Sequence, residues 1–236
     1  SSIMKNASAV CFTTEEEMSL AQKTFWPFDC RKIVTGLGVQ EPPIGEVKQK
    51  ALFKKKFTTI KGKKLLLYMG RIHPKKGLDL LLTSFVKQAK SEHVLTIAGP
   101  INDQCGYTQK LVRTYNSSSG VLWTGMLEGD LKWGALRSAD AMILPSHQEN
   151  YGMVVAEACS VGTPVLITNK VNLYREILQY DAGFVDNDNQ DGVDNLIKKW
   201  ISGKVQSKKQ HAINCFKEKL HIYSTAEKII DIANKR

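Results

Sequence analysis

Short apolar runs alternate with amphipathic segments along most of the chain. The run KLLLYMG at 64–70 precedes a segment, 78–89, in which Leu78, Leu81 and Phe85 recur at helical spacing. The alternation continues to residue 201. It predicts strands at 93–100, 120–125, 141–146, 164–168 and 182–186, and helices at 107–115, 130–139, 152–161, 172–178 and 192–201, with Gly162 as a left-handed cap.

The apolar runs lack a regular alternation of polar residues, which indicates that both faces of each strand are buried. A helix after each strand requires right-handed crossovers between parallel strands. The pattern therefore predicts an α/β protein with a Rossmann-like, doubly wound parallel sheet over about residues 31–205. Such sheets bind ligands beyond the carboxyl ends of their strands, so the residues that follow the strands are the candidates for chemistry.

Two segments lie outside this alternation. Residues 7–25 contain one strand-like and one helix-like stretch, separated from the rest by WPFDC and TGLGVQEPP. At the other end, residues 206–236 are predicted to form closing helices packed on the domain. In that tail Phe216, Leu220, Tyr223 and Ile230 follow helical spacing.

The composition is that of a folded globular protein. The 236 residues are 42% hydrophobic and 24% charged, which argues against a disordered or fibrous chain. No apolar run approaches the roughly 18 residues that span a bilayer, and SSIMKNASAV lacks the order of a signal peptide. The five cysteines are scattered and form no CxxC pair, which argues against disulfides or zinc and predicts a cytoplasmic protein: Cys11, Cys30, Cys105, Cys159 and Cys215.

The net charge of +10 is concentrated in VKQKALFKKKFTTIKGKK, residues 47–64. A solvated surface beside a strand is the favoured interpretation of this segment. The segment has none of the aromatic interleaving of a nucleic-acid platform, so no nucleic-acid partner is expected. Attraction to an anionic membrane face, and hence a peripheral location at the inner side of the membrane, remains an alternative.

The loop after the first long strand carries GRIHPKKG at 70–77. It leaves the strand at Gly70 and presents Arg71, Lys75 and Lys76 where a helix begins, which suits a diphosphate. A solvated basic loop is the alternative. His73 has no second titratable partner nearby in sequence and is interpreted as a polar loop residue rather than a base.

Two glutamates mark a later strand end, in LPSHQENYGMVVAEACSVGTPVLIT at 144–168. Glu149 precedes an apolar helical run and Glu157 lies inside it, where a carboxylate is costly unless it finds donors. The hydroxyls of a ribose would satisfy Glu157. Alternatively, Glu149 is a helix-start carboxylate and Glu157 pairs with a lysine.

GRIHPKKG together with PSHQENYGMVVAEACSVGTPVLIT resembles the C-terminal, nucleotide-sugar-binding half of GT-B glycosyltransferases, in particular the retaining family 4. Glu149 and Glu157 match that family's motif of two glutamates with seven residues between them. The resemblance runs from about residue 5 to the end. It implies sugar transfer from a nucleoside diphosphate, with UDP favoured, without a metal or other cofactor, to a glycan or lipid-linked acceptor.

The resemblance also implies roles for individual residues. Arg71 and Lys76 would bind the diphosphate and stabilise its developing charge, Glu149 would bind the donor sugar, and Glu157 the ribose. Arg71, Lys76 and Glu149 are thus the expected catalytic residues. The amides of 150–152 would contact the sugar and phosphates, and the backbone of 126–127 the base. The full expected donor site is Gly70, Arg71, Lys76, Met126, Leu127, Glu149, Asn150, Tyr151, Gly152, Met153 and Glu157.

The chain departs from the family in two respects, at Thr35 and in its length. Thr35 stands where an asparagine is expected in KIVTGLGVQ, and Glu41 occupies the third position of a would-be GxGxxG, so this segment is no dinucleotide fingerprint. Family members are nearly twice as long, so residues 1–30 are interpreted as the end of an acceptor domain. The chain is then expected to bind donor without turnover. The alternative functions are a non-catalytic nucleotide-binding module or a binder of anionic surfaces.

Overall fold

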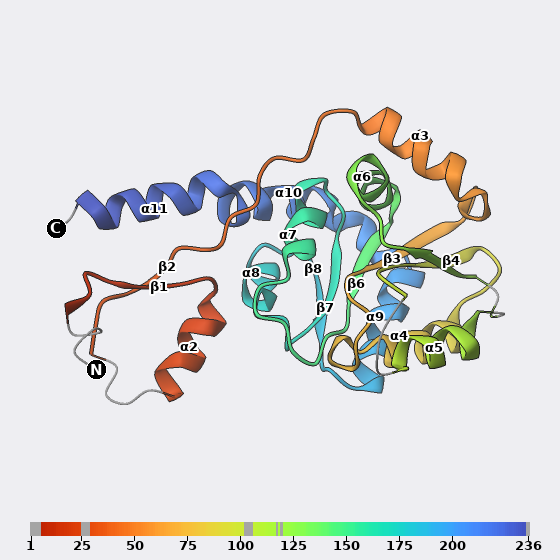
Figure 1. Cartoon of the computed structure of the whole chain (residues 1–236), viewed down its shortest axis with the longest axis horizontal. Helices are drawn as coiled ribbons and strands as arrows, with labels where there is room; N and C mark the ends of the chain where they lie inside the picture. Colours follow the sequence, from red (N-terminus) through yellow and green to blue (C-terminus); the bar gives the residue numbers. More distant parts are fainter. Residues whose placement is uncertain (1–5, 25–28, 102–105, 117, 119, 235–236) are drawn as a thin grey trace.

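A computed structural model describes residues 6–24, 29–101, 106–116, 118 and 120–234 of the chain (Figure 1). Its centre is a six-stranded sheet in the order β5-β4-β3-β6-β7-β8, with every neighbouring pair parallel. The α/β, Rossmann-like fold predicted from the pattern is confirmed. The strands are β3 (Lys64–Met69), β4 (His93–Ala98), β5 (Val121–Gly125), β6 (Ala141–Leu144), β7 (Val165–Thr168) and β8 (Gly183–Asp186).

Helices cover both faces of this sheet (Figure 1). One layer holds α4 (Leu78–Gln88), α5 (Tyr107–Tyr115) and α9 (Gln190–Ile201), and α4 packs against α9. The other holds α6 (Gly129–Ser138), α7 (Met153–Ser160), α8 (Tyr174–Gln179) and α10 (Lys209–Cys215). The strand order runs outward from β3 to β5 and then resumes on the other side of β3 with β6. Residues that follow β3 and β6 therefore face a common crevice.

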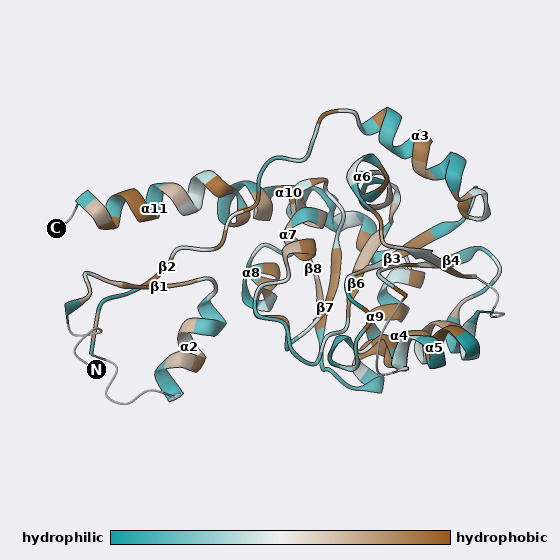
Figure 2. Cartoon of the chain, viewed as in Figure 1, coloured by the Kyte–Doolittle hydropathy of each residue, from teal (hydrophilic) through white to brown (hydrophobic). Residues whose placement is uncertain are grey.

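The sheet is buried because its strands are apolar on both faces. Leu66, Leu67 and Tyr68 of β3 are fully buried, and β4 and β6 are buried along their whole lengths. Burying a side chain of this size contributes about 1.5–3 kcal/mol, so the central strands form the main core. The hydrophobic colouring of β6 and β7 in Figure 2 shows the same interior.

One helix lies outside the predicted series. α3 (Glu46–Lys56) packs across α6 at Gly134, where an added Cβ would lie 2.2 Å from the Gln49 carbonyl oxygen. Only Gln49 and Phe53 of α3 are buried, so its sequence carries no apolar stripe that indicates a helix. Most of the lysines expected beside a strand are therefore on a helix and on the turn before β3. Figure 2 shows α3 as largely hydrophilic.

A smaller unit precedes the main domain. β1 (Val10–Phe12) and β2 (Lys32–Val34) form a two-stranded parallel sheet joined by α2 (Glu15–Thr24). Every residue of α2 keeps some exposure. Residues 32–34 pair with this unit and not with the large sheet, which begins at Lys64. Residues 1–5 and 25–28, including the predicted end of the helical stretch at residue 25, lie outside the described residues, and the predicted boundary at 30–31 stays a prediction.

The tail contains a break that its helical spacing does not show. α10 is followed by a π-helical turn, η4 (Phe216–Leu220), then an extended residue, His221, and α11 (Ile222–Asn234). The break arises because Val39 pairs with the tail: its N–H donates to the Leu220 carbonyl at 2.8 Å and its carbonyl accepts from Ile222 N–H at 3.0 Å. The tail therefore contains more than one helix, and the helical spacing of Phe216, Leu220, Tyr223 and Ile230 is interrupted at His221. In the described part of the chain, no helix has the length and hydrophobicity needed to span a bilayer.

Candidate functional site

A cleft of about 900 Å³ opens at the carboxyl ends of β3, β4, β5 and β6. This is the crevice where the strand order reverses, the place at which doubly wound sheets bind ligands. Residues after each of the four strands contribute to it. Its walls comprise Met69, Gly70, Arg71 and Lys76, then Ala98, Gly99 and Pro100, then Met126, Leu127, Glu128, Gly129 and Lys132, and finally Leu144, Glu149, Gly152, Met153, Val154 and Glu157.

The loop GRIHPKKG is held by its own polar groups. The phenol of Tyr68 donates a hydrogen bond to the Arg71 carbonyl at 2.8 Å. Burial raises the pKa of Tyr68, so this hydroxyl stays a donor. The Nδ1 atom of His73 accepts from Lys75 N–H at 3.1 Å and caps the short turn η2 (Pro74–Lys76). His73 thus caps this turn and also lines a pocket with Arg71 and Lys76, and its assignment as a polar loop residue rather than a base stays a prediction.

Gly77 allows the loop to end in α4. It has a φ of +63°, and an added Cβ would lie 2.1 Å from the Pro145 carbonyl oxygen. The backbone after β3 and the backbone after β6 therefore meet at this glycine. That contact brings Lys76 and the segment of Glu149 together across the crevice.

Lys76 and Glu149 form an ion pair in this structure. Their side chains are only 13% and 22% exposed. A second pocket of about 450 Å³ adjoins the cleft and shares Arg71, Lys76 and Glu149 with it. It adds Lys75 and Asn150 to the polar groups at this end of the crevice.

Glu157 forms the second ion pair of the cleft. Its Oε1 atom lies 2.6 Å from Nζ of Lys132, which projects from α6, and the two side chains are 16% and 27% exposed. The alternative interpretation of Glu157, a carboxylate paired with a lysine, therefore describes this state correctly. The alternative for Glu149 does not, because α7 begins only at Met153 and the Glu149 backbone instead bonds to Lys170 and Asn172.

The cleft brings together the predicted donor-binding residues with two exceptions. Asn150 lines the adjoining pocket. Tyr151 is 5% exposed and its side chain lines a different cavity, so only its backbone remains available for the expected role. Sequence reasoning missed Gly99 and Pro100, although their position directly after β4 was a usable signal. It also missed Lys132, for which the sequence carries no signal.

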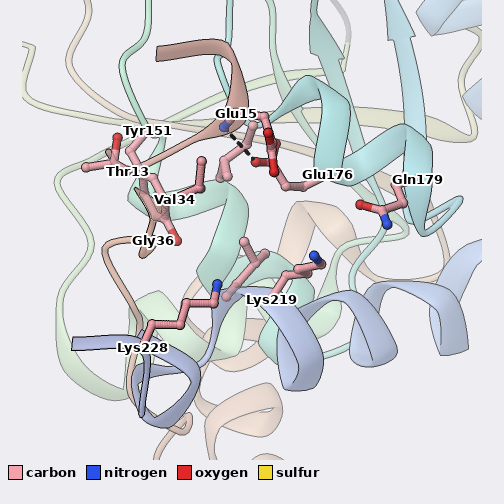
Figure 3. Close-up of a pocket in the computed structure, with 11 residues that line it drawn as sticks. Thr13, Glu15, Val34, Gly36, Tyr151, Glu176, Gln179, Lys219 and Lys228 are labelled. Atoms are coloured by element: carbon pink, nitrogen blue, oxygen red, sulfur yellow. Dashed lines mark hydrogen bonds between the residues drawn. The ribbon is translucent and has the colours of Figure 1, made fainter. Parts of the chain in front are cut away.

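The side chain of Tyr151 faces a small cavity of about 40 Å³, between the β1–α2 unit and α8, η4 and α11 (Figure 3). Glu15 N–H donates to Oε1 of Glu176 there at 3.3 Å, and Lys219 and Lys228 approach from the opposite wall. Burial raises the pKa of Glu176 and lowers that of Lys228. The space suits one or two water molecules, not a nucleotide, so this cavity is a contact between elements.

Cysteine and metal-ligand geometry add no further site. Cys11, Cys30, Cys159 and Cys215 are free thiols, and Cys105 lies outside the described residues. Among the residues that the structure describes, no group of three or more His, Cys, Asp or Glu side chains is placed to hold a metal ion. The charged side chains that line the cleft are the Lys76–Glu149 pair and the Lys132–Glu157 pair, together with Arg71 and Glu128.

Comparison with known proteins identifies relatives of this fold and cleft. An uncharacterized glycosyltransferase of Methanocaldococcus jannaschii is 26% identical over 158 residues, which are 64% of this chain and 40% of that protein. Sucrose-phosphate synthase from Thermosynechococcus elongatus shares the fold with a TM-score of 0.80 at 17% identity, covering 99% of this chain and 59% of that one. Anabaena HepE in complex with UDP and glucose superposes with a TM-score of 0.81 at 13% identity, covering 99% and 65%.

The chain thus spans less than two thirds of the length of each of these proteins. The family model described as Glycosyl transferases group 1 matches residues 49–218, which include the whole sheet and every residue of the cleft. The resemblance drawn from GRIHPKKG and the paired glutamates is confirmed, and the chain belongs to the glycosyl transferases group 1 family.

Proposed function

We propose that this chain is the donor-binding domain of a retaining, metal-independent glycosyltransferase that uses a nucleoside-diphosphate sugar, with UDP the favoured nucleotide. One observation carries the proposal: Arg71 and Lys76 line the same cleft as Glu149 and Glu157, at the point where the strand order reverses. Family membership supports the reaction class. The structural similarity to a protein solved with UDP and glucose supports the donor.

The two cations suit the diphosphate. Arg71 and Lys76 would bind its oxygens and offset the negative charge that grows on the leaving phosphate as the sugar bond breaks. They lie just before α4, whose N-terminal amides add positive potential. This charge substitutes for the divalent cation that other transferases use, which supports a mechanism without a metal.

The two carboxylates suit hydroxyl groups. Glu157 would accept hydrogen bonds from the ribose, and Glu149, beside the adjoining pocket, from the donor sugar. The backbone of 126–127 would contact the base, since Met126 and Leu127 follow β5 at the cleft wall. Gly70 and Met153 line the space between these groups.

Donor binding would exchange partners at Lys76, Glu149 and Glu157, whereas Arg71 has no carboxylate partner among the described residues. Lys76 would leave Glu149 for the diphosphate, and each glutamate would exchange its lysine for hydroxyl groups. Because the four side chains of these ion pairs are only 13–27% exposed, the exchange is favourable where phosphate and hydroxyl groups replace the partners that are lost. A donor that offers both phosphates and hydroxyls satisfies all four side chains at once.

The test is calorimetric titration with UDP, GDP, ADP, UDP-glucose and GDP-mannose, with and without chelator. We expect selective, chelator-insensitive binding of one nucleotide class, and a loss of about 10–100-fold in Arg71→Ala and Glu157→Ala, because each removes hydrogen bonds to or from a charged group. Glu46→Ala is the matched control, since Glu46 pairs with Lys50 and Arg137 away from the cleft. Binding that vanishes with chelator, or that survives both cleft substitutions, contradicts the proposal.

A non-catalytic nucleotide-binding module is the second candidate, because Arg71, Lys76 and Glu157 of the cleft could bind a nucleotide without a sugar site. The two functions differ at Glu149. A sugar-binding role predicts that Glu149→Ala lowers the affinity for UDP-glucose relative to UDP, while freeing Lys76 for the diphosphate. An unchanged ratio of the two affinities favours the module.

The acceptor and the turnover belong to the same proposal. A glycan or lipid-linked acceptor, reached at the cytoplasmic face of a membrane, would bind to a part of the protein beyond this chain, since the related proteins are longer. The isolated chain would bind donor and transfer little sugar, because catalysis requires a closed cleft. Robust glycosyl transfer by the 236-residue chain would contradict this part.

A further inference from the structure

A separate basic pocket lies at the opposite end of the sheet from the donor cleft. Its volume is about 320 Å³, and it is enclosed by the end of α3, the turn at 61–63, the start of β3 and the end of α6. Lys54, Lys61 and Lys63 line it, with Ser138 and Asp140 on the inner wall. Figure 1 shows α3 descending to this turn at the β3 end of the domain.

The lysines of this pocket have no acidic partners. In the ranges that the structure describes, no carboxylate lies within 4 Å of Nζ of Lys54, Lys61 or Lys63. Two lysines of α3 differ, because Lys48 pairs with Asp130 at 3.1 Å and Lys50 with Glu46 at 3.1 Å, whereas Lys55 and Lys56 have no carboxylate partner among the described residues either. The positive charge of the three pocket lysines is therefore not offset by an ion pair within the part of the chain that the structure describes.

The acidic residue of the pocket is already bonded. Oδ2 of Asp140 accepts from Leu65 N–H at 2.7 Å, and Oδ1 accepts from the side-chain amide of Gln206 at 3.1 Å. These bonds hold the Asp140 carboxylate against the start of β3 and away from the lysine tips. Three lysines against one carboxylate leave the pocket with a net positive charge.

The inner wall carries a hydroxyl without a partner. Oγ of Ser138 is buried and makes no hydrogen bond to any described residue. A buried polar atom without a partner costs free energy, and a ligand oxygen would remove that cost. The pocket thus combines flexible ammonium groups with a donor hydroxyl, which is a chemistry suited to phosphate oxygens.

We propose that this pocket binds a phosphate-class anion, held by Lys54, Lys61 and Lys63 and by the hydroxyl of Ser138. The site is independent of the donor cleft and of the proposed sugar transfer. The anion can come from a lipid headgroup or from a soluble phosphate. The lipid source agrees with the apolar side chains exposed before α3 and in its first turn, where Ile44 is fully exposed and Val47 is 84% exposed.

The test is residue-specific. Inorganic pyrophosphate is titrated into the isotope-labelled 236-residue chain at constant ionic strength, and amide resonances of Gly62 and Ser138 are followed separately from those of Gly70 and Gly152 in the donor cleft. Flotation with phosphatidylglycerol vesicles, compared with phosphatidylcholine vesicles, distinguishes a lipid source from a soluble one. Polyuridylate is included as a competing polyanion.

Lys61→Met with Lys63→Met should weaken the anion affinity at Gly62 and Ser138 at least tenfold, and Ser138→Ala about threefold. The matched control is Lys55→Met with Lys56→Met, which removes the same charge from the same surface outside the pocket and should change the affinity less than twofold. Unchanged thermal midpoints and unchanged shifts at Gly70 show that the variants fold. The proposal would be overturned if both double variants lost the same anion affinity. It would also be overturned if only polyuridylate bound saturably, or if neither pyrophosphate nor vesicles gave a response.

Discussion

The two ends of the central sheet treat their basic side chains differently. At the carboxyl end, Lys76 and Lys132 each contact a glutamate, and the pairs lie in a cleft lined by residues from four strand ends. At the amino end, Lys61 and Lys63 line a pocket without a carboxylate partner among the described residues. A ligand of the cleft meets the unpaired Arg71 but must replace the partners of Lys76, Glu149 and Glu157, whereas an anion at the amino end replaces no carboxylate of the three lysines. The cleft therefore distinguishes its ligands by both their phosphate and their hydroxyl groups, and the pocket distinguishes its ligands mainly by their negative charge.

The largest expected effects come from substituting two glycines, Gly99 beside the donor cleft and Gly134 at the contact of α6 with α3. An added Cβ at Gly99 would lie 2.1 Å from the Gly70 carbonyl oxygen, and one at Gly134 would lie 2.2 Å from the Gln49 carbonyl oxygen. Because both contacts are with backbone, each alanine substitution should lower the free energy of unfolding by about 2–3 kcal/mol, measured by urea denaturation.

The two variants should differ in what else they lose. Gly99→Ala should weaken UDP binding at least tenfold and leave the pyrophosphate response at Gly62 unchanged. Gly134→Ala displaces α3, so it should weaken the pyrophosphate response at Gly62 and leave UDP binding unchanged. If either variant impairs both sites equally, the two ends are one coupled unit and the comparison fails.

A smaller effect is expected from the ion pair of Lys132 and Glu157. Lys132→Met leaves a carboxylate that is 16% exposed without its partner, and should cost about 1–2 kcal/mol of unfolding free energy. Adding Glu157→Gln should recover part of that loss, with a coupling energy of about 1 kcal/mol in a double-mutant cycle. Lys61→Met at the other end should change stability by less than about 0.5 kcal/mol. Similar costs for Lys132→Met and Lys61→Met would remove the distinction between paired and unpaired lysines.

A pH-dependent effect is expected at a reference pair outside both sites. Lys87 contacts Asp194 at 2.8 Å between α4 and α9. Burial raises the pKa of Asp194, but hydrogen bonds from Lys87, Ser84 and Gln190 outweigh it and lower the pKa to about 2, from an ordinary 3.8.

A carboxyl whose pKa is depressed by folding stabilises the fold above its unfolded pKa and loses that contribution as the pH falls through its folded pKa. The stability difference between the wild type and Asp194→Asn should therefore be constant from pH 7 to about pH 5. It should shrink between pH 4 and pH 2. Denaturation curves across this range measure it, and a difference that does not change with pH would show that the pair contributes no charge-dependent stability.

Much of the large sheet and of the cleft could be predicted because both depend on local signals. Runs such as 64–70 are apolar on both faces, and the first residues after parallel strands must meet at one edge of the sheet. That rule places Arg71 and Glu149 in one crevice although they are far apart in the sequence. α3 was not predictable in this way, because only two of its residues are buried and its stability depends on contact with α6 at Gly134.

The alternation of strands and helices, the family, and the residues that can bind phosphates and hydroxyls follow from the order of residues along the chain, because these depend on side-chain chemistry and on periodicity. The partner of each charge instead depends on how the elements pack in three dimensions. Lys132 meets Glu157 because α6 and α7 lie side by side, and the tail breaks at His221 because Val39 pairs with the residues on either side of it. Such contacts depend on the distance between elements in space, which no pattern along the chain contains.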